Sequence, residues 1–350
     1  MQSRLFGQLP NGQAVDLYTL TNAAGAAIEV ITYGAIIRSV RVPDRAGRLD
    51  DVVLGFNDLA SYVAPHPYIG AIAGRIAGRV TGGRLEIEGR TYPLVLNNGA
   101  NHLHGGLVGL DKRVWTAAHA KRPDGADSVR LTYFSPDGEE GYPGNLDIAV
   151  TYTLTADSAL IVETAATSDQ VTPLVLAQHS YFNLAGEGSG PATGHHVEIR
   201  ADRFVGAADD GFTLSGRAEP VAGSGNDFNQ PRELGPALDG LFRRHGVIYL
   251  LRAPGAPTPV APNRVARITE PASGRVLEVS TTEPCLQFYT GMALDGTLVG
   301  KSGRTYGPYA GLCFECQGYP DGASRPEFGD ILVRPGRPQH RTTVYAFKTN

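Results

Sequence analysis

The stretch LDIAVTYTL, residues Leu146–Leu154, is followed after a short connection by ALIVET, residues Ala159–Thr164. Both stretches have an apolar pattern with a period of two residues and are rich in β-branched and aromatic side chains, which is typical of β-strands. The connection contains the turn signal Ala156-Asp157. The segment therefore predicts two strands separated by a turn.

The same pattern recurs from one end of the chain to the other, between further turn signals. The other predicted strands are Ala27–Tyr33, Ile36–Val42, Arg84–Glu88, Val129–Phe134, Arg264–Thr269, Arg275–Thr281, Cys285–Thr290 and Thr342–Lys348. Helical periodicity is scarce, and short helices are expected only near Ser61–Ala64 and Pro236–Leu241. Strands do not alternate with helices as a doubly wound parallel sheet requires. We therefore expect an all-β fold, a large antiparallel β-sandwich with very few short helices.

The chain shows no internal repeat and no shift in composition that would mark a domain boundary. The Pro- and Gly-rich stretch Arg252–Asn263 resembles a linker, but strand patterns resume directly after it. We therefore expect one domain over residues 1–350. With 42% hydrophobic residues, the chain has ample material for a large core.

Charge and hydropathy exclude several classes of partner. The 31 basic and 35 acidic residues contain no basic run, which argues against nucleic-acid binding. The longest apolar run, Val247–Leu251, is far shorter than the ~20 residues of a membrane span. The N-terminus lacks the apolar segment of a signal peptide, and three cysteines do not indicate a disulfide framework. We therefore expect a cytoplasmic protein.

The segment NHLHGG, Asn101–Gly106, contains two histidines beside a pair of glycines. In an extended segment, His102 and His104 share a face because side chains two residues apart point to the same side. A His-x-His pair is typical of cupin metal sites, but Val108 and Gly109 stand where the carboxylate is required. A metal site and a structural histidine in a tight turn both stay open.

His179, in the segment QHSYFNL, follows the apolar strand Leu174–Ala177. A histidine at the end of a buried strand is partly desolvated, so its pKa can be tuned across neutrality, as general acid–base chemistry requires. Taken alone, such a residue is more often a hydrogen-bonded histidine of the core.

Glu315, in the segment CFECQGYPD, interrupts an apolar run. Burial among apolar neighbours raises the pKa of a carboxyl group and makes it a better base near neutral pH. Cys313 and Cys316 imitate a C-x-x-C metal motif, but residues three apart on a strand face opposite sides, so we expect no zinc there. Glu315 and Gln317 share a face instead.

Arg79 closes the glycine-rich segment GRIAGR, and Gln287 lies in LQFYTG. A planar guanidinium in a turn can hold hydroxyl or carboxylate groups. An amide flanked by two aromatic residues is typical of a sugar-binding surface. Each signal is weak alone, because exposed arginines and strand aromatics are mostly structural.

Taken together, these segments resemble the aldose 1-epimerase (galactose mutarotase) family. The resemblance is collinear from about Gly34 to the C-terminus. The segments that carry it, in family order, are GRIAGRVTGG, NHLHGGLVGLDKRVW, DGEEGYPG, HSYFNLAG, SGRVLEVSTTEPCLQFYTG and FECQGYPD. The resemblance implies a single galactose mutarotase-like domain, a β-supersandwich, with no cofactor and no metal. It also implies an isomerase that interconverts the α and β anomers of a free sugar.

The resemblance assigns a general base to Glu315 and a general acid to His179. Glu315 would take the proton of the anomeric hydroxyl while His179, as an imidazolium, protonates the ring oxygen. The ring opens to the aldehyde, C1–C2 rotates, and reclosure with reversed proton roles gives the other anomer. The substrate-binding residues that the resemblance implies are Arg79, His104, Tyr181 and Gln287.

Two positions depart from the family pattern. Arg243-Arg244-His245 stands where the best-studied relatives carry an aspartate before a histidine, so Arg244 replaces that carboxylate, with Asp239 as a distant substitute. Gly78 replaces an asparagine. We hypothesise that the reaction class is kept while the preferred sugar differs from galactose or glucose. A pentose, or an acidic or phosphorylated sugar that pairs with Arg244, would fit.

Other functions stay open at this point. A non-catalytic sugar-binding sandwich would not need both an acid and a base. A glycosidase normally needs two flanking carboxylates, of which only Glu315 has a suitable context. An epimerase-family enzyme specialised for a charged or unusual sugar is kept open by Arg244. The expected partner is a small-molecule sugar, and the expected state is a monomer or a homodimer.

Overall fold

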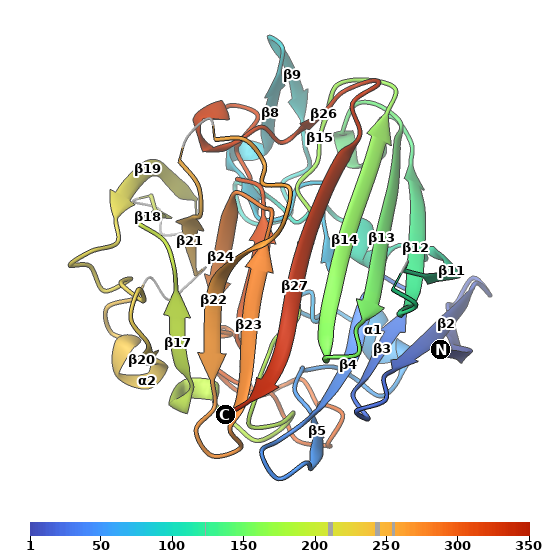
Figure 1. The fold of residues 1–350 in the computed structure, drawn as a ribbon. Helices are drawn as coiled ribbons and strands as arrows, with labels where there is room; N and C mark the ends of the chain where they lie inside the picture. Colours follow the sequence, from blue (N-terminus) through green and yellow to red (C-terminus); the bar gives the residue numbers. More distant parts are fainter. Residues whose placement is uncertain (123, 209–212, 242–245, 254–255) are drawn as a thin grey trace.

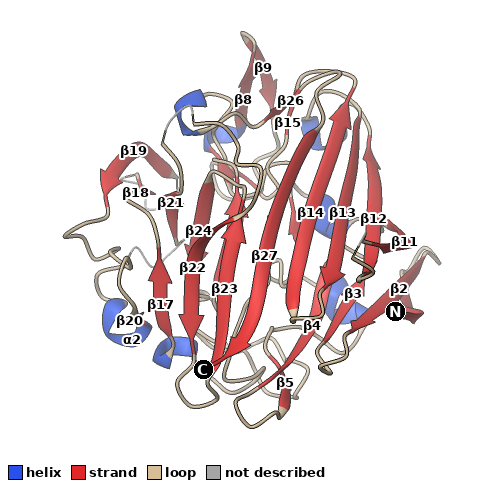
Figure 2. Cartoon of the chain, in the orientation of Figure 1, coloured by secondary structure: helices blue, strands red, loops and turns tan. Residues whose placement is uncertain are grey.

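The structure, a computed structural model, describes residues 1–122, 124–208, 213–241, 246–253 and 256–350. Strands dominate these ranges, and the α-helices found in them are α1 (Leu59–Val63) and α2 (Leu234–Ala237) (Figure 2). Within the same ranges, no helix has the length and apolar character that a membrane span requires. The expected all-β fold with very few short helices is confirmed.

A nine-stranded antiparallel sheet faces the viewer in Figure 1. Within it, Leu146–Leu154 forms β13, the third strand from one edge, and pairs in unbroken register with β14 (Ala159–Ser168), as the two-residue period and the turn between them predict. The strands in spatial order are β11 (Thr116–Lys121), β12 (Asp127–Ser135), β13, β14, β27 (Gln339–Thr349), β23 (Arg275–Thr281), β22 (Asn263–Thr269), β17 (His196–Ile199) and β20 (Arg232–Glu233).

Two five-stranded antiparallel sheets complete the main framework. The N-terminal sheet comprises β1 (Gln2–Gln8), β2 (Ala14–Thr21), β3 (Ala27–Ile31), β4 (Ile36–Pro43) and β5 (Leu49–Asp51). The other, here called the site sheet, has the order β19 (Leu214–Pro220), β18 (Arg203–Ala207), β21 (Val247–Leu250), β24 (Cys285–Tyr289) and β25 (Cys313–Gln317). Short pairs join β6 (Ile72–Ala73) to β16 (Ala177–Gln178), β7 (Arg79–Val80) to β10 (His102–Leu103), β8 (Arg84–Ile87) to β9 (Arg90–Pro93), and β15 (Thr172–Pro173) to β26 (Leu332–Val333).

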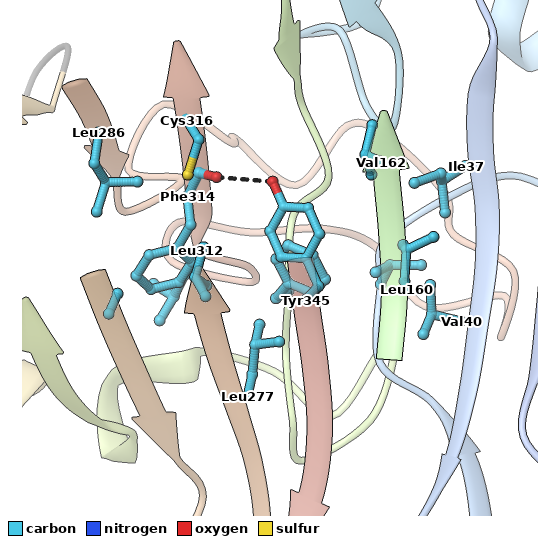
Figure 3. Close-up of a cluster of buried hydrophobic side chains, with 14 of the residues drawn as sticks. Ile37, Val40, Leu160, Val162, Leu277, Leu286, Leu312, Phe314, Cys316 and Tyr345 are labelled. Atoms are coloured by element: carbon cyan, nitrogen blue, oxygen red, sulfur yellow. Dashed lines mark hydrogen bonds between the residues drawn. The ribbon is translucent and has the colours of Figure 1, made fainter. Parts of the chain in front are cut away.

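The largest hydrophobic cluster joins all three sheets (Figure 3). Leu160 and Tyr345 of the large sheet belong to it together with Val40 of the N-terminal sheet and Phe314 of the site sheet. The hydroxyl of Tyr345 donates a hydrogen bond of 3.0 Å to the carbonyl oxygen of Phe314. The two smaller sheets therefore pack on the large one, and β25 is fixed to it by both packing and a buried hydrogen bond.

Alternation along β25 separates the core from the site. Phe314 and Cys316 are buried in the cluster that the large sheet shares. Because successive side chains of a strand point to opposite faces, Cys313, Glu315 and Gln317 face the other side of the site sheet. The strand thus confirms the expectation that Glu315 and Gln317 share a face.

We expect Phe314→Ala to lower the free energy of unfolding by about 3–5 kcal/mol, as is typical when a buried phenylalanine leaves a cavity. The matched control is Phe134→Ala, because the ring of Phe134 on β12 is 54% exposed and such surface changes usually stay within about 0.5 kcal/mol. Urea denaturation of both variants tests the claim. Equal losses in the two variants would contradict the packing described for β25.

Candidate active site

A cavity of about 220 Å³ lies against the face of the site sheet opposite to the core. Glu315 on β25 and Gln287 on β24 are directly paired across the two strands and both line it. The neighbouring pair, Phe314 and Phe288, is also in direct register and points into the core. The cavity floor is thus set by the strand register.

Six of the seven residues expected at the site line this cavity. They are Arg79, His104, His179, Tyr181, Gln287 and Glu315. Arg244, the seventh, lies outside the described residues, and Asp239, its distant substitute, is not among the residues that line the cavity in the described part of the chain.

The central feature of the site is the pair formed by His179 and Glu315. His179 Nε2 lies 3.7 Å from Glu315 Oε2, and both side chains are almost fully buried. His179 follows β16, and its backbone is fixed by its own N–H to the carbonyl oxygen of Ala71 and by its carbonyl oxygen to the N–H of Gly70, each at 2.9 Å. The separation exceeds a hydrogen bond, so a hydroxyl group of a ligand can contact both groups.

Three neighbouring side chains contact the imidazole of His179. The ring of Tyr181 stacks on it with a centroid separation of 5.2 Å, and the ring of His104 meets it edge-on at 5.4 Å. Its second nitrogen, Nδ1, lies 3.7 Å from the sulfur of Cys313. The ring therefore presents Nε2 to Glu315 and Nδ1 to the thiol.

Burial controls the protonation of the pair. It raises the pKa of Glu315 to about 8, against the opposing effect of the positive charge of Arg79. It lowers the pKa of His179 to about 4. At neutral pH the carboxyl group therefore holds a proton and the imidazole is neutral. The direction for Glu315 matches the sequence expectation, whereas His179 differs from the imidazolium expected, because desolvation disfavours a cation at this depth.

Two further side chains are oriented by local hydrogen bonds. His104 has a left-handed backbone (φ 48°), and its Nδ1 accepts a hydrogen bond of 3.2 Å from the N–H of Gly78. The neutral ring therefore carries its hydrogen on Nε2, and burial lowers the pKa of His104 well below its usual range. Arg79, on β7, donates from Nε to Asn98 Oδ1 at 2.9 Å.

His102 does not share the role of His104. One nitrogen of its ring contacts the carbonyl oxygen of Val95 at 2.8 Å, and the other contacts the hydroxyl of Tyr142 at 2.6 Å. The strand β10 ends at Leu103, so the extended geometry that would place both histidines on one face is not formed. Both ring nitrogens of His102 are thus engaged by protein groups, which favours the alternative of a structural histidine.

The pairing of Cys313 with Cys316 also fails, as expected, because the two sulfurs lie on opposite faces of β25. Among the residues that the structure describes, one cluster of three metal-ligating side chains occurs. It consists of His179, Cys313 and Glu315, whose donor atoms lie within 4.8 Å of one another.

Sequence reasoning missed Tyr68 and Asn98. The ring of Tyr68 lies 4.3 Å from that of His104 and lines the cavity, but its segment APHPYIG shows no strand or helix period. Asn98 holds Arg79, yet the sequence around it reads only as a turn. The sequence around Gln287 did indicate an aromatic surface, to which Tyr289 contributes in the cavity.

Comparisons with known proteins show which family the chain belongs to. The sequence profile of the aldose 1-epimerase family matches residues 16–346. The galactose mutarotase of Sus scrofa is 40% identical over 346 residues, covering 98% of this chain and 97% of that protein. For the galactose mutarotase of Homo sapiens the identity is 41% over 344 residues, with the same coverage.

The fold gives the same result. The crystal structure of an aldose epimerase homologue from C. elegans superposes with a TM-score of 0.86 at 30% identity, covering 95% of this chain and 98% of that one. The assignment to a family does not rest on the fold alone. The family profile matches nearly the whole chain, and the sequence identities to the relatives are near 40%. The chain belongs to the aldose 1-epimerase family.

Proposed function

We propose that this protein is a mutarotase in which Glu315 and His179 interconvert the α and β anomers of a free aldose. The observation that carries the proposal is the buried pair itself, with Nε2 and Oε2 3.7 Å apart on the floor of a cavity. A binding module without turnover would have no use for two desolvated titratable groups at this distance. Perturbed pairs of this kind are typical of catalytic sites.

The pair holds one proton that can move between its two members. For ring opening, this proton must first pass from Glu315 to His179, against the preference that burial gives to the neutral pair. The Glu315 carboxylate then accepts the proton of the anomeric hydroxyl while the His179 imidazolium protonates the ring oxygen. The products of this step are a neutral carboxyl group and a neutral imidazole, which is the protonation state that burial favours in the empty cavity. Ring closure on either face of the aldehyde reverses these transfers. Glu315 gives its proton to the carbonyl oxygen, and His179 takes the proton of the attacking hydroxyl.

Other lining residues would bind the sugar. The guanidinium of Arg79, the amide of Gln287 and the Nε2–H of His104 offer hydrogen bonds to hydroxyl groups. Tyr181 and Tyr289 offer ring faces to the apolar side of a pyranose. Positioning a bound hydroxyl against Glu315 lowers the barrier because the reacting groups already have the required geometry.

Some expectations stay predictions. The expected preference for a pentose or a charged sugar rests on Arg244. Because Arg244 lies outside the described residues, this preference is inferred from the sequence alone. A single domain over residues 1–350 is supported by the largest core cluster, which draws residues from Leu20 to Phe347. The cytoplasmic location and the monomeric or homodimeric state stay predictions as well.

Polarimetry on freshly dissolved α-anomers tests the proposed function. Galactose, xylose, arabinose and glucose 6-phosphate are compared with and without protein in EDTA. We expect faster approach to the same final rotation for at least one sugar. A ranking led by a sugar other than galactose would support the hypothesis on Arg244, and an ordinary galactose preference would contradict it. No acceleration of any sugar by folded protein would contradict the mutarotase.

Glu315→Gln should lower kcat by about 10²–10⁴-fold, the usual contribution of one general acid or base, because the amide keeps the shape of the carboxyl group and loses its basicity. Sugar binding should be largely retained. The matched control is Glu283→Gln, since Glu283 is also a largely covered carboxylate, paired with Arg341 at 3.5 Å outside the cavity. A Glu315→Gln enzyme with near-normal kcat would refute the assigned base.

The protonation of Glu315 also predicts how stability depends on pH. The unfolded state releases this proton at the ordinary pKa of 4.5, while the folded state retains it up to about 8. The free energy of unfolding of the wild type, relative to Glu315→Gln, should therefore fall as pH rises through this range. Urea denaturation of both proteins across the range measures the difference. A constant difference would mean that Glu315 ionises at an ordinary pKa.

A further inference from the structure

Cys313 has no task in the proposed chemistry, yet it contacts the proposed acid. Its sulfur is fully buried and lies 3.7 Å from Nδ1 of His179. It is on the same face of β25 as Glu315, two residues away. One donor atom from each of His179, Cys313 and Glu315 lies within 4.8 Å of the others.

Thiolate, imidazole and carboxylate are the side-chain ligands that Zn²⁺ prefers. Tetrahedral coordination with bonds of ~2.0–2.3 Å places ligand atoms roughly 3.3–3.8 Å apart. Two separations in the cluster, Nε2 to Oε2 and Nδ1 to Sγ, are already 3.7 Å. An ion binds only one nitrogen of the ring, so these two separations cannot both be used. The three donor atoms lie within 4.8 Å of one another. A side-chain rotation that shortens the longer separations by at most about an ångström would therefore bring them to the distances of a zinc site.

Charge and access also fit a divalent cation. Coordination removes the proton of the Cys313 thiol and that of the Glu315 carboxyl group, and both protons leave to solvent. The resulting thiolate and carboxylate balance the two positive charges of the ion, although the guanidinium of Arg79 lines the same cavity. His179 and Glu315 line the cavity, which gives an ion access and leaves a fourth position for water or a sugar hydroxyl.

We propose that His179, Cys313 and Glu315 form a latent site for Zn²⁺ and similar thiophilic divalent cations, whose occupation inhibits the enzyme. The ion is an inhibitor and not a cofactor, because it engages the lone pair of the base and a nitrogen of the acid. Inhibition rests on the proposed mutarotase function, whereas metal binding does not.

Four proteins test the proposal: the wild type, Cys313→Ala, Cys313→Ser and Cys316→Ala. Cys316 is the matched control because it is equally buried on the same strand and faces the core. Polarimetry at increasing ZnCl₂ should show inhibition of the wild type and of Cys316→Ala, reversed by EDTA. Either substitution of Cys313 should raise the inhibitory concentration by at least about 100-fold, beyond the ~10–100-fold typical for loss of an outer partner of a metal ligand.

Co²⁺ provides a readout without turnover, since a cobalt–thiolate bond absorbs in the near ultraviolet. We expect this absorption in the wild type and in Cys316→Ala, and its loss in both Cys313 variants. Absence of the band from an active wild type, or equal zinc sensitivity of the Cys313 variants, would overturn the metal site. A band in a protein without mutarotase activity would keep the metal site and refute the proposed function. If Cys313→Ala fails to fold, the nearly isosteric serine variant decides.

Discussion

The desolvation of one carboxyl group, that of Glu315, is the constraint on which the site depends. A charged carboxylate on the floor of this cavity would be costly, so the group retains its proton to a pKa of about 8. The same burial keeps His179 neutral. The pair thus shares a single proton, which lies on Glu315 at neutral pH. The acid–base chemistry that we propose depends on this burial.

The sandwich makes this burial possible by using both faces of one strand. On β25, Phe314 packs into the core with Tyr345, while its neighbour Glu315 faces the cavity. Since the hydroxyl of Tyr345 also donates a hydrogen bond to the backbone of Phe314, the large sheet fixes the position of the neighbouring Glu315, the proposed base. Arg79 on β7 and His104, which directly follows the partner strand β10, line the other wall of the cavity. A rigid floor and a separately built wall together define the space for a sugar.

The sequence predicts the fold well because a two-residue period directly reports a half-buried sheet. The boundaries of β13 and β23 agree with prediction, whereas β14 and β27 are longer, since their ends are set by pairing with neighbours. Glu315 and His179 stand out through their apolar surroundings, and the resemblance to the family adds their roles. The contact of Cys313 with His179 could not be predicted, because the two residues are 134 positions apart in sequence.

Local conformation limited the rest of the prediction. The left-handed backbone of His104 separates it from His102, and no pattern in NHLHGG reveals this. Tyr68 enters the cavity from a loop whose position depends on the packed sheets. Such residues are positioned by tertiary contacts, which alternation along a strand does not report.

The most direct test of the claim that burial keeps Glu315 protonated is a ¹³C NMR titration of its carboxyl carbon. The signal is assigned by its absence from the Glu315→Gln spectrum. Burial predicts that the signal keeps the chemical shift of a protonated carboxyl through neutral pH and titrates near 8. A carbon that titrates near the ordinary value of 4.5 would show that Glu315 is ionised at neutral pH, and would contradict the shared proton on which the proposed chemistry depends.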